Sequence, residues 1–123
     1  MILVIDDEPT ITELLTDILE YHGLPVIVAH DAQAALDLVQ LQRPEAILVD
    51  LMMPSVDGLS LAVTLRHHPA TRDVPLIAMS ASGSALALAD KMGDFDAYLT
   101  KPFENDTLVA LVERIVHSNS RAV

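Results

Sequence analysis

The stretch Glu45-Ala46-Ile47-Leu48-Val49-Asp50-Leu51-Met52-Met53-Pro54 decides the fold of this chain. Its unbroken apolar run stops at Asp50, which is typical of a strand buried on both faces of a sheet. Pro54 cannot donate to a strand ladder, so the strand must end before it. The stretch Ile2-Leu3-Val4-Ile5 has the same form and runs directly into Asp6-Asp7. Two buried strands are therefore expected to carry carboxylates at their ends.

Outward from these two stretches, short apolar runs alternate with amphipathic helical patterns. The predicted strands are 2–5, 26–29, 46–50, 76–79 and about 95–99. The predicted helices lie between Pro9 and Gly23, Asp31 and Pro44, Gly58 and Pro69, about Ser82 and Met92, and around Leu108 to Ile115. Pro54 to Gly58 is predicted to be a loop. Such alternation favours an α/β fold with a parallel sheet and helices on both faces.

The composition is that of one globular domain. The chain has 123 residues, of which 51% are hydrophobic and 20% charged. We expect residues 1–123 to form a single domain with its core over about 2–116 and a frayed tail at 118–123. There is no cysteine, which excludes a disulfide framework and thiolate metal sites and fits a cytoplasmic location.

Charge and hydropathy exclude two further classes of function. The formal net charge of −11 repels phosphate backbones, so we expect no direct binding of nucleic acid. No apolar run reaches the roughly 20 residues that a membrane-spanning helix needs. We therefore expect no association with a membrane.

Polar groups follow four of the predicted strands: Asp6-Asp7, Asp50, Ser80 and Lys101. Periodicity does not give the strand order. In the flavodoxin-like order 2-1-3-4-5, ligands bind beyond the carboxyl ends of the first and third strands. Asp6-Asp7 and Asp50 would then lie together, and one pair of carboxylates about 4 Å apart costs roughly 4 kcal/mol at an effective dielectric near 20. A bound Mg²⁺ would relieve this repulsion, because it takes oxygen ligands.

Each of these residues also has an ordinary structural interpretation. Asp6 or Asp7 could cap the first helix, Ser80 could be a turn residue, and Lys101 could be solvated. Taken together, they favour phosphoryl transfer to a carboxylate, which is already ionised and needs no general base. Asp50, on the central strand, is the predicted nucleophile. Asp6 and Asp7 would hold the metal, and Lys101 and Ser80 would contact the phosphoryl group.

These motifs resemble the receiver domain of bacterial two-component response regulators over nearly the whole chain. The resemblance lies in the joint spacing of Asp6-Asp7, Asp50, Met53-Pro54, Asp57-Gly58, Ser80-Ala81 and Lys101-Pro102-Phe103. It implies the five-stranded flavodoxin-like doubly wound sheet, order 2-1-3-4-5, with five helices. It also implies that a histidine kinase or histidine phosphotransfer protein phosphorylates Asp50.

The resemblance assigns further roles around the acceptor. The backbone carbonyl of Met52 would complete a site for Mg²⁺ or Mn²⁺ with Asp6, Asp7 and Asp50. The Lys101-Pro102 peptide would be cis. Ser80 and Tyr98 would form a switch that changes the surface presented to partners. A homodimer through the fourth helix, fifth strand and fifth helix is a further expectation.

Two other functions compete with a signalling switch. A phosphohydrolase with an aspartyl-phosphate intermediate usually needs a carboxylate two residues after the nucleophile, where this chain has Met52. A receiver-like module used only for docking would not need the acidic pair, acceptor and lysine that are all present. We therefore expect no enzyme activity beyond self-phosphorylation from small donors and slow self-dephosphorylation. The target is either a separate protein or an output domain outside this sequence.

Overall fold

A five-stranded parallel sheet forms the centre of the molecule in the computed structural model, which describes residues 1–53 and 56–121. Its strands are β1 (Ile2–Ile5), β2 (Val26–Ala29), β3 (Ala46–Asp50), β6 (Leu76–Ser80) and β7 (Ala97–Thr100), in the order β2-β1-β3-β6-β7. This order confirms the predicted flavodoxin-like topology. The order reverses between β1 and β3, so the carboxyl ends of these two strands form the binding edge of such a sheet.

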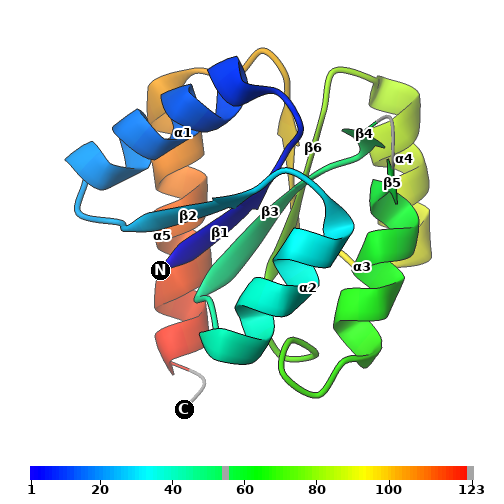
Figure 1. The fold of residues 1–123 in the computed structure, drawn as a ribbon. Helices are drawn as coiled ribbons and strands as arrows, with labels where there is room; N and C mark the ends of the chain where they lie inside the picture. The colour runs from blue at the N-terminus through cyan, green and yellow to red at the C-terminus, as the bar shows by residue number, and fades with distance from the viewer. Residues whose placement is uncertain (54–55, 122–123) are drawn as a thin grey trace.

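Five helices cover the two faces of the sheet. They are α1 (Pro9–Tyr21), α2 (Ala32–Leu41), α3 (Gly58–His67), α4 (Gly83–Met92) and α5 (Asn105–Arg121). α1 and α5 pack on one face and α2, α3 and α4 on the other, each over its own hydrophobic cluster (Figure 1). Strand residues alternate between the two clusters, so β1 and β3 are buried on both sides, as their unbroken apolar runs predicted.

Three helices begin directly after an N-cap residue whose side chain accepts a hydrogen bond from a backbone N–H of the first turn. Asp31 accepts a hydrogen bond from the Ala34 N–H at the start of α2, as its position predicted. Asp57 and Ser82 do the same for α3 and α4. Gly93 ends α4 with φ of 76°, a left-handed conformation that glycine adopts at low cost.

The structure corrects the predicted loop from Pro54 to Gly58. Met52–Met53 (β4) and Val56–Asp57 (β5) form a two-stranded antiparallel sheet, with Met52 opposite Asp57. α3 then begins at Gly58. The apolar run of β3 hid this short pair, because two residues are too few to show a period. Pro54 and Ser55 lie outside the described residues.

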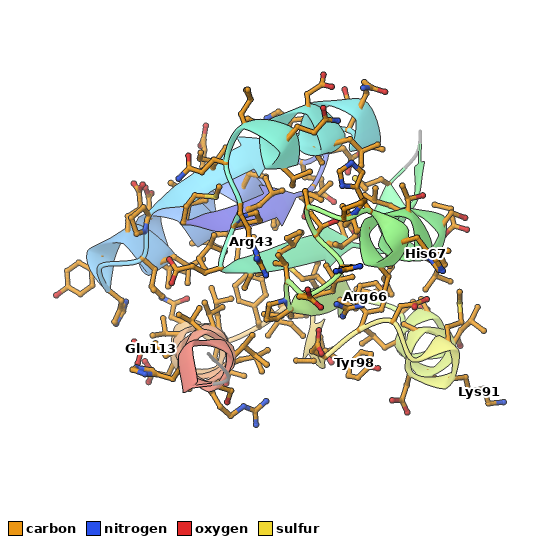
Figure 2. The ribbon with its side chains drawn as sticks, turned by 90° about the horizontal axis from the view of Figure 1, so that it is seen from below. Arg43, Arg66, His67, Lys91, Tyr98 and Glu113 are labelled. Carbon is orange, nitrogen blue, oxygen red and sulfur yellow. The ribbon has the colours of Figure 1, made fainter. Side chains whose placement is uncertain are left out.

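The last strand begins later than predicted. β7 is Ala97–Thr100, whereas the sequence indicated about 95–99. Asp96 precedes the strand, and its side chain accepts hydrogen bonds from the Leu76 N–H and from the Arg66 guanidinium. Arg66 also donates to the carbonyl of Asp94 and lies between α3 and the turn before β7 (Figure 2). This side-chain bonding holds Asp96 in the turn.

The first helix is not capped by either of the two aspartates that precede it. Glu8 is the N-cap of α1, without a side-chain bond, so neither Asp6 nor Asp7 caps this helix. α5 extends to Arg121, and the fraying of residues 118–123 stays a prediction. Residues 122–123 lie outside the described residues. Within the described ranges, the helices are too short or too polar to cross a bilayer.

Candidate functional site

Three carboxylates meet at the switch point of the sheet. Asp6 follows β1 and Asp50 ends β3, and these strands are neighbours, with Ile5 opposite Val49. Asp6 and Asp50 are 0% and 3% exposed. Asp6, Asp7 and Asp50 each offer one oxygen, and these oxygens all lie within 4.8 Å of one another. Such a set of oxygen donors fits a hard divalent cation such as Mg²⁺ or Mn²⁺.

Lys101 supplies positive charge to this group from the end of β7. Its Nζ atom lies 2.9 Å from Oδ2 of Asp6 and 3.6 Å from Oδ2 of Asp50. Burial alone would lower the pKa of the Lys101 ammonium, but the hydrogen bond to Asp6 and the nearby carboxylate charges outweigh it and raise that pKa. Lys101 therefore stays charged and partly offsets the mutual repulsion of the carboxylates.

Backbone N–H groups orient the two buried carboxylates. The N–H of Met52 donates to Oδ1 of Asp50 at 3.0 Å, and the N–H of Glu8 donates to Oδ1 of Asp6 at 3.0 Å. Burial raises the pKa of the Asp50 carboxyl, against the Met52 hydrogen bond that lowers it. The charge of Asp6 raises it further, and that of Lys101 lowers it. The buried Asp50 carboxylate would therefore be stabilised by a proton, a cation or any other group that neutralises its negative charge.

Ser80 lies at the same edge, at the end of β6. Its side chain is buried, and its hydroxyl oxygen accepts a hydrogen bond from the Ser82 N–H at 3.0 Å. The carbonyl of Ser80 accepts from the Lys101 N–H at 2.9 Å, which joins two predicted site residues through the backbone. The Lys101-Pro102 peptide bond is cis in this structure. The structure thus brings Asp6, Asp7, Asp50, Ser80 and Lys101 to one edge; the role of the Met52 carbonyl stays a prediction.

Tyr98 lies apart from the carboxylates. Its ring is half-buried between α4 and α5 (Figure 2), and its hydroxyl donates to Oδ1 of Asp90 on α4 at 3.1 Å. Burial, followed by this hydrogen bond and the charge of Asp90, raises the pKa of the Tyr98 phenol. Tyr98 lies on β7, three residues before Lys101, and pairs in register with Ala78, two residues before Ser80. The role of Ser80 and Tyr98 as a switch stays a prediction.

Sequence reasoning missed two contacts near the site. The Tyr98–Asp90 hydrogen bond joins residues whose meeting depends on the packing of α4 against β7, which no local pattern gives. In the sequence Gly58 stands out only as part of the Asp57-Gly58 motif, but in the structure its backbone lies against that of Asp50. A glycine at the first position of a helix does not reveal this contact, because Gly83 begins α4 in the same way and a Cβ there would meet nothing within 4 Å.

Comparison with known proteins places this arrangement in a family. The family model of the response regulator receiver domain matches residues 2–113. The transcriptional regulatory protein CpxR of Escherichia coli is 40% identical over 117 residues, covering 94% of this chain and 48% of CpxR. The DNA-binding dual master transcriptional regulator RpaA of Synechocystis is 36% identical, covering 98% of this chain and 50% of RpaA. The chain thus spans about half the length of these relatives.

Solved structures agree with the sequence comparisons. The receiver domain of the Francisella response regulator 1452 has a TM-score of 0.83 at 34% identity, covering 95% of this chain and 96% of that one. The receiver domain of NtrX from Brucella abortus has a TM-score of 0.86 at 30% identity, covering 95% and 98%. By its sequence match, its fold and its acidic switch-point site, this chain belongs to the response regulator receiver domain family of two-component systems.

Proposed function

We propose that this chain is a phosphorylation-activated signalling switch whose acceptor is Asp50. The donor would be a phosphohistidine on a histidine kinase or histidine phosphotransfer protein. The observation that carries the proposal is the position of the buried Asp50 carboxylate, grouped with two other carboxylates and 3.6 Å from the Lys101 ammonium. Residues 1–123 would act as one receiver domain with its core over about 2–116.

The transfer needs only a positioned carboxylate. One oxygen of Asp50 attacks phosphorus, the bond from phosphorus to the donor nitrogen breaks, and the imidazole leaves with the electron pair. The Met52 N–H holds Oδ1 of Asp50 and so fixes the direction of the other oxygen. The Lys101 ammonium lies 3.6 Å from Oδ2 of Asp50 and would stabilise the negative charge of the phosphoryl oxygens after transfer.

A divalent cation fits the remaining acidic groups. Asp6, Asp7, Asp50 and the Met52 carbonyl are the proposed ligands of Mg²⁺ or Mn²⁺. When bound, such an ion supplies charge neutralisation for the phosphoryl oxygens. Asp6 is already oriented by the Glu8 N–H, which leaves its Oδ2 shared with Lys101.

The output would be a change of the α4–β7–α5 surface. In the structure, the Ser80 hydroxyl accepts from the Ser82 N–H, and Tyr98 is bonded to Asp90. Attraction of the Ser80 hydroxyl to a phosphoryl oxygen would open room for Tyr98 to move inward. The change can be no larger than the differential interaction of the phosphoryl group with the two states. This surface would contact a target protein, an output domain or a second copy of the chain, in the cytoplasm.

Phosphohydrolase activity has less support than a slow switch. Met52 occupies the position two residues after Asp50; this residue is 65% exposed, and its side chain carries no acid or base. We therefore propose self-phosphorylation from small donors and slow self-dephosphorylation as the only catalysis. Hydrolysis of p-nitrophenyl phosphate with turnover would favour the phosphohydrolase instead.

Intact-mass spectrometry after incubation with Mg²⁺ and acetyl phosphate tests the proposal. The parent should gain one phosphoryl group, and Asp50→Asn should gain none, because an amide is not an anionic nucleophile. Asp73→Asn is the matched control, since the Asp73 side chain is 72% exposed and forms an ion pair with neighbouring Arg72, away from the acidic site. It should label like the parent. A parent that takes no label would support the docking-module alternative, and equal labelling of Asp50→Asn would refute the assignment.

A further inference from the structure

The first turn of α3 touches the backbone of the acceptor residue. A Cβ built with ideal geometry on Gly58 would lie 2.6 Å from the carbonyl oxygen of Asp50 and 2.7 Å from Cα of Leu51. Ordinary contact begins at 3.4 Å, so any side chain at Gly58 is about 0.8 Å too close. The φ of Gly58 is not positive, so the need for glycine comes from space and not from the backbone conformation.

The acceptor peptide is held on its other side as well. The Leu51 N–H donates to the carbonyl of Met79 at 3.0 Å, which ties the end of β3 to β6. On the α3 side, Gly58 is buried, and Leu61 and Leu65 anchor the helix in the hydrophobic core. The Asp50–Leu51 peptide is therefore fixed between β6 and the first turn of α3, and neither side can retreat without losing packing or a ladder hydrogen bond.

Further bonds fasten the first turn of α3 at this place. Oδ1 of Asp57 accepts from the Leu59 N–H at 2.9 Å, and its Oδ2 accepts from the Ser60 hydroxyl at 3.1 Å. Asp57 also lies opposite Met52 in the β4–β5 pair. The residue that caps α3 is thus paired with the residue whose N–H holds the Asp50 carboxylate.

We infer that the first turn of α3 is a positioning element for the acceptor, and that Gly58 is its contact residue. By fitting against the Asp50–Leu51 peptide, Gly58 sets the direction of the Asp50 side chain and the place of the Met52 N–H. This inference rests on the proposed function for its effect on phosphorylation. The coupling of Gly58 to the hydrogen bond between Asp50 and the Met52 N–H is independent of the proposed function.

Two glycines that begin helices allow a matched test. Gly58 and Gly83 are the first residues of α3 and α4, and both follow a side-chain cap. A Cβ on Gly83 meets nothing within 4 Å. Gly58→Ala and Gly83→Ala therefore make the same chemical change at equivalent helix positions, but only the first presses on the acceptor peptide.

The readouts are the rate constant of labelling at saturating acetyl phosphate with Mg²⁺, the folded fraction from urea unfolding, and the backbone amide resonance of Met52 without donor. Gly58→Ala should lower the rate constant about tenfold or more after correction for folded fraction, because sub-ångström misplacement is costly in an in-line reaction. Its Met52 amide resonance should shift. Gly83→Ala should label within twofold of the parent and leave that resonance in place.

A second variant covers the case in which Gly58→Ala does not fold. Asp57→Ala adds no volume but releases the first turn of α3, so it should slow labelling a few-fold and shift the Met52 amide resonance. Parent-like labelling and an unmoved Met52 resonance in the folded variants would overturn the inference. If the parent itself takes no label, the proposed function fails, and the Met52 resonance alone then decides on the positioning role.

Discussion

Removing the Lys101 charge tests the electrostatics of the acidic site. Lys101 contacts two buried carboxylates, Asp6 at 2.9 Å and Asp50 at 3.6 Å, and its own side chain is 14% exposed. At an effective dielectric near 20, each contact is about 5 kcal/mol of attraction before desolvation is counted. Breaking a buried pair by removing one partner typically costs about 3–5 kcal/mol. Lys101→Met should therefore lower the free energy of unfolding of the metal-free protein by about 3–5 kcal/mol at neutral pH.

The effect should depend on pH in a defined direction. The pKa of Lys101 is raised in the folded protein, so its stabilising charge is fully present below the ordinary value of 10.5. Asp50 has a raised pKa, so its folded form takes up a proton more readily than the unfolded chain. Without Lys101 this uptake becomes easier still. The loss in free energy of unfolding caused by Lys101→Met should therefore become smaller as the pH falls toward 3.8, the ordinary pKa of an aspartate carboxyl.

Urea unfolding in EDTA measures this difference. Lys91→Met is the matched control, because Lys91 is exposed on α4 and points away from the core (Figure 2). It should change stability by no more than about 0.5 kcal/mol. Added Mg²⁺ should recover part of the loss in Lys101→Met, since it supplies positive charge to the same carboxylates. A loss below about 1 kcal/mol for Lys101→Met at neutral pH would refute this electrostatic account.

Three further predictions follow from the site. When the Mg²⁺ concentration is 100 times the dissociation constant of Mg²⁺, the free energy of unfolding of the parent should rise by about 2.7 kcal/mol, as measured by urea titrations with and without the ion. Asp7→Ala should lose most of this gain. A parent whose stability does not respond to Mg²⁺ would contradict the metal site. Beryllofluoride with Mg²⁺ should shift amide resonances near Tyr98 in the parent but far less in Ser80→Ala, and equal shifts in both would place the switch elsewhere. Met52→Asn combined with Ser82→Glu should shorten the phosphoryl lifetime after donor removal, because polar side chains there can orient the attacking water; a parent that decays as fast as the double variant would argue against orientation as the limiting factor.

The side chains of Met52 and Ser82 bear on the lifetime of the phosphoryl group. The Ser82 hydroxyl oxygen accepts a hydrogen bond from the Ala85 N–H at 3.2 Å, so it is engaged in capping α4. The Met52 side chain is largely exposed and offers no useful donor or acceptor. Met52 therefore cannot orient a water in line with the bond to Asp50, and the oxygen of Ser82 is engaged at the start of α4.

The sheet and the site edge were predictable because their signals are local. The apolar runs of β1 and β3 end at Asp6 and Asp50, and parallel strands bring such ends to one edge whatever fills the rest of the sequence. Ser80 and Lys101 follow the same rule on β6 and β7. The strand order itself came from the family resemblance and not from periodicity.

What the sequence did not reveal depends on contacts between distant segments. The start of β7 depends on Asp96, whose side chain is bound by Arg66 and by the Leu76 N–H, 20 or more residues away. The β4–β5 pair is too short to leave a period. The closeness of Gly58 to Asp50 arises only when α3 packs against the end of β3. Such features follow from tertiary packing, which no window of sequence contains.

Locating the phosphoryl group chemically tests the central claim most directly. An acyl phosphate is an activated carboxyl group, so borohydride reduces a phosphorylated aspartate to homoserine and leaves free carboxylates unchanged. The protein should be labelled with acetyl phosphate and Mg²⁺, reduced, digested and sequenced by tandem mass spectrometry. The account predicts homoserine at position 50 and aspartate at positions 6 and 7. Homoserine at 6 or 7, or at no position in a protein that carries the added mass, would contradict it.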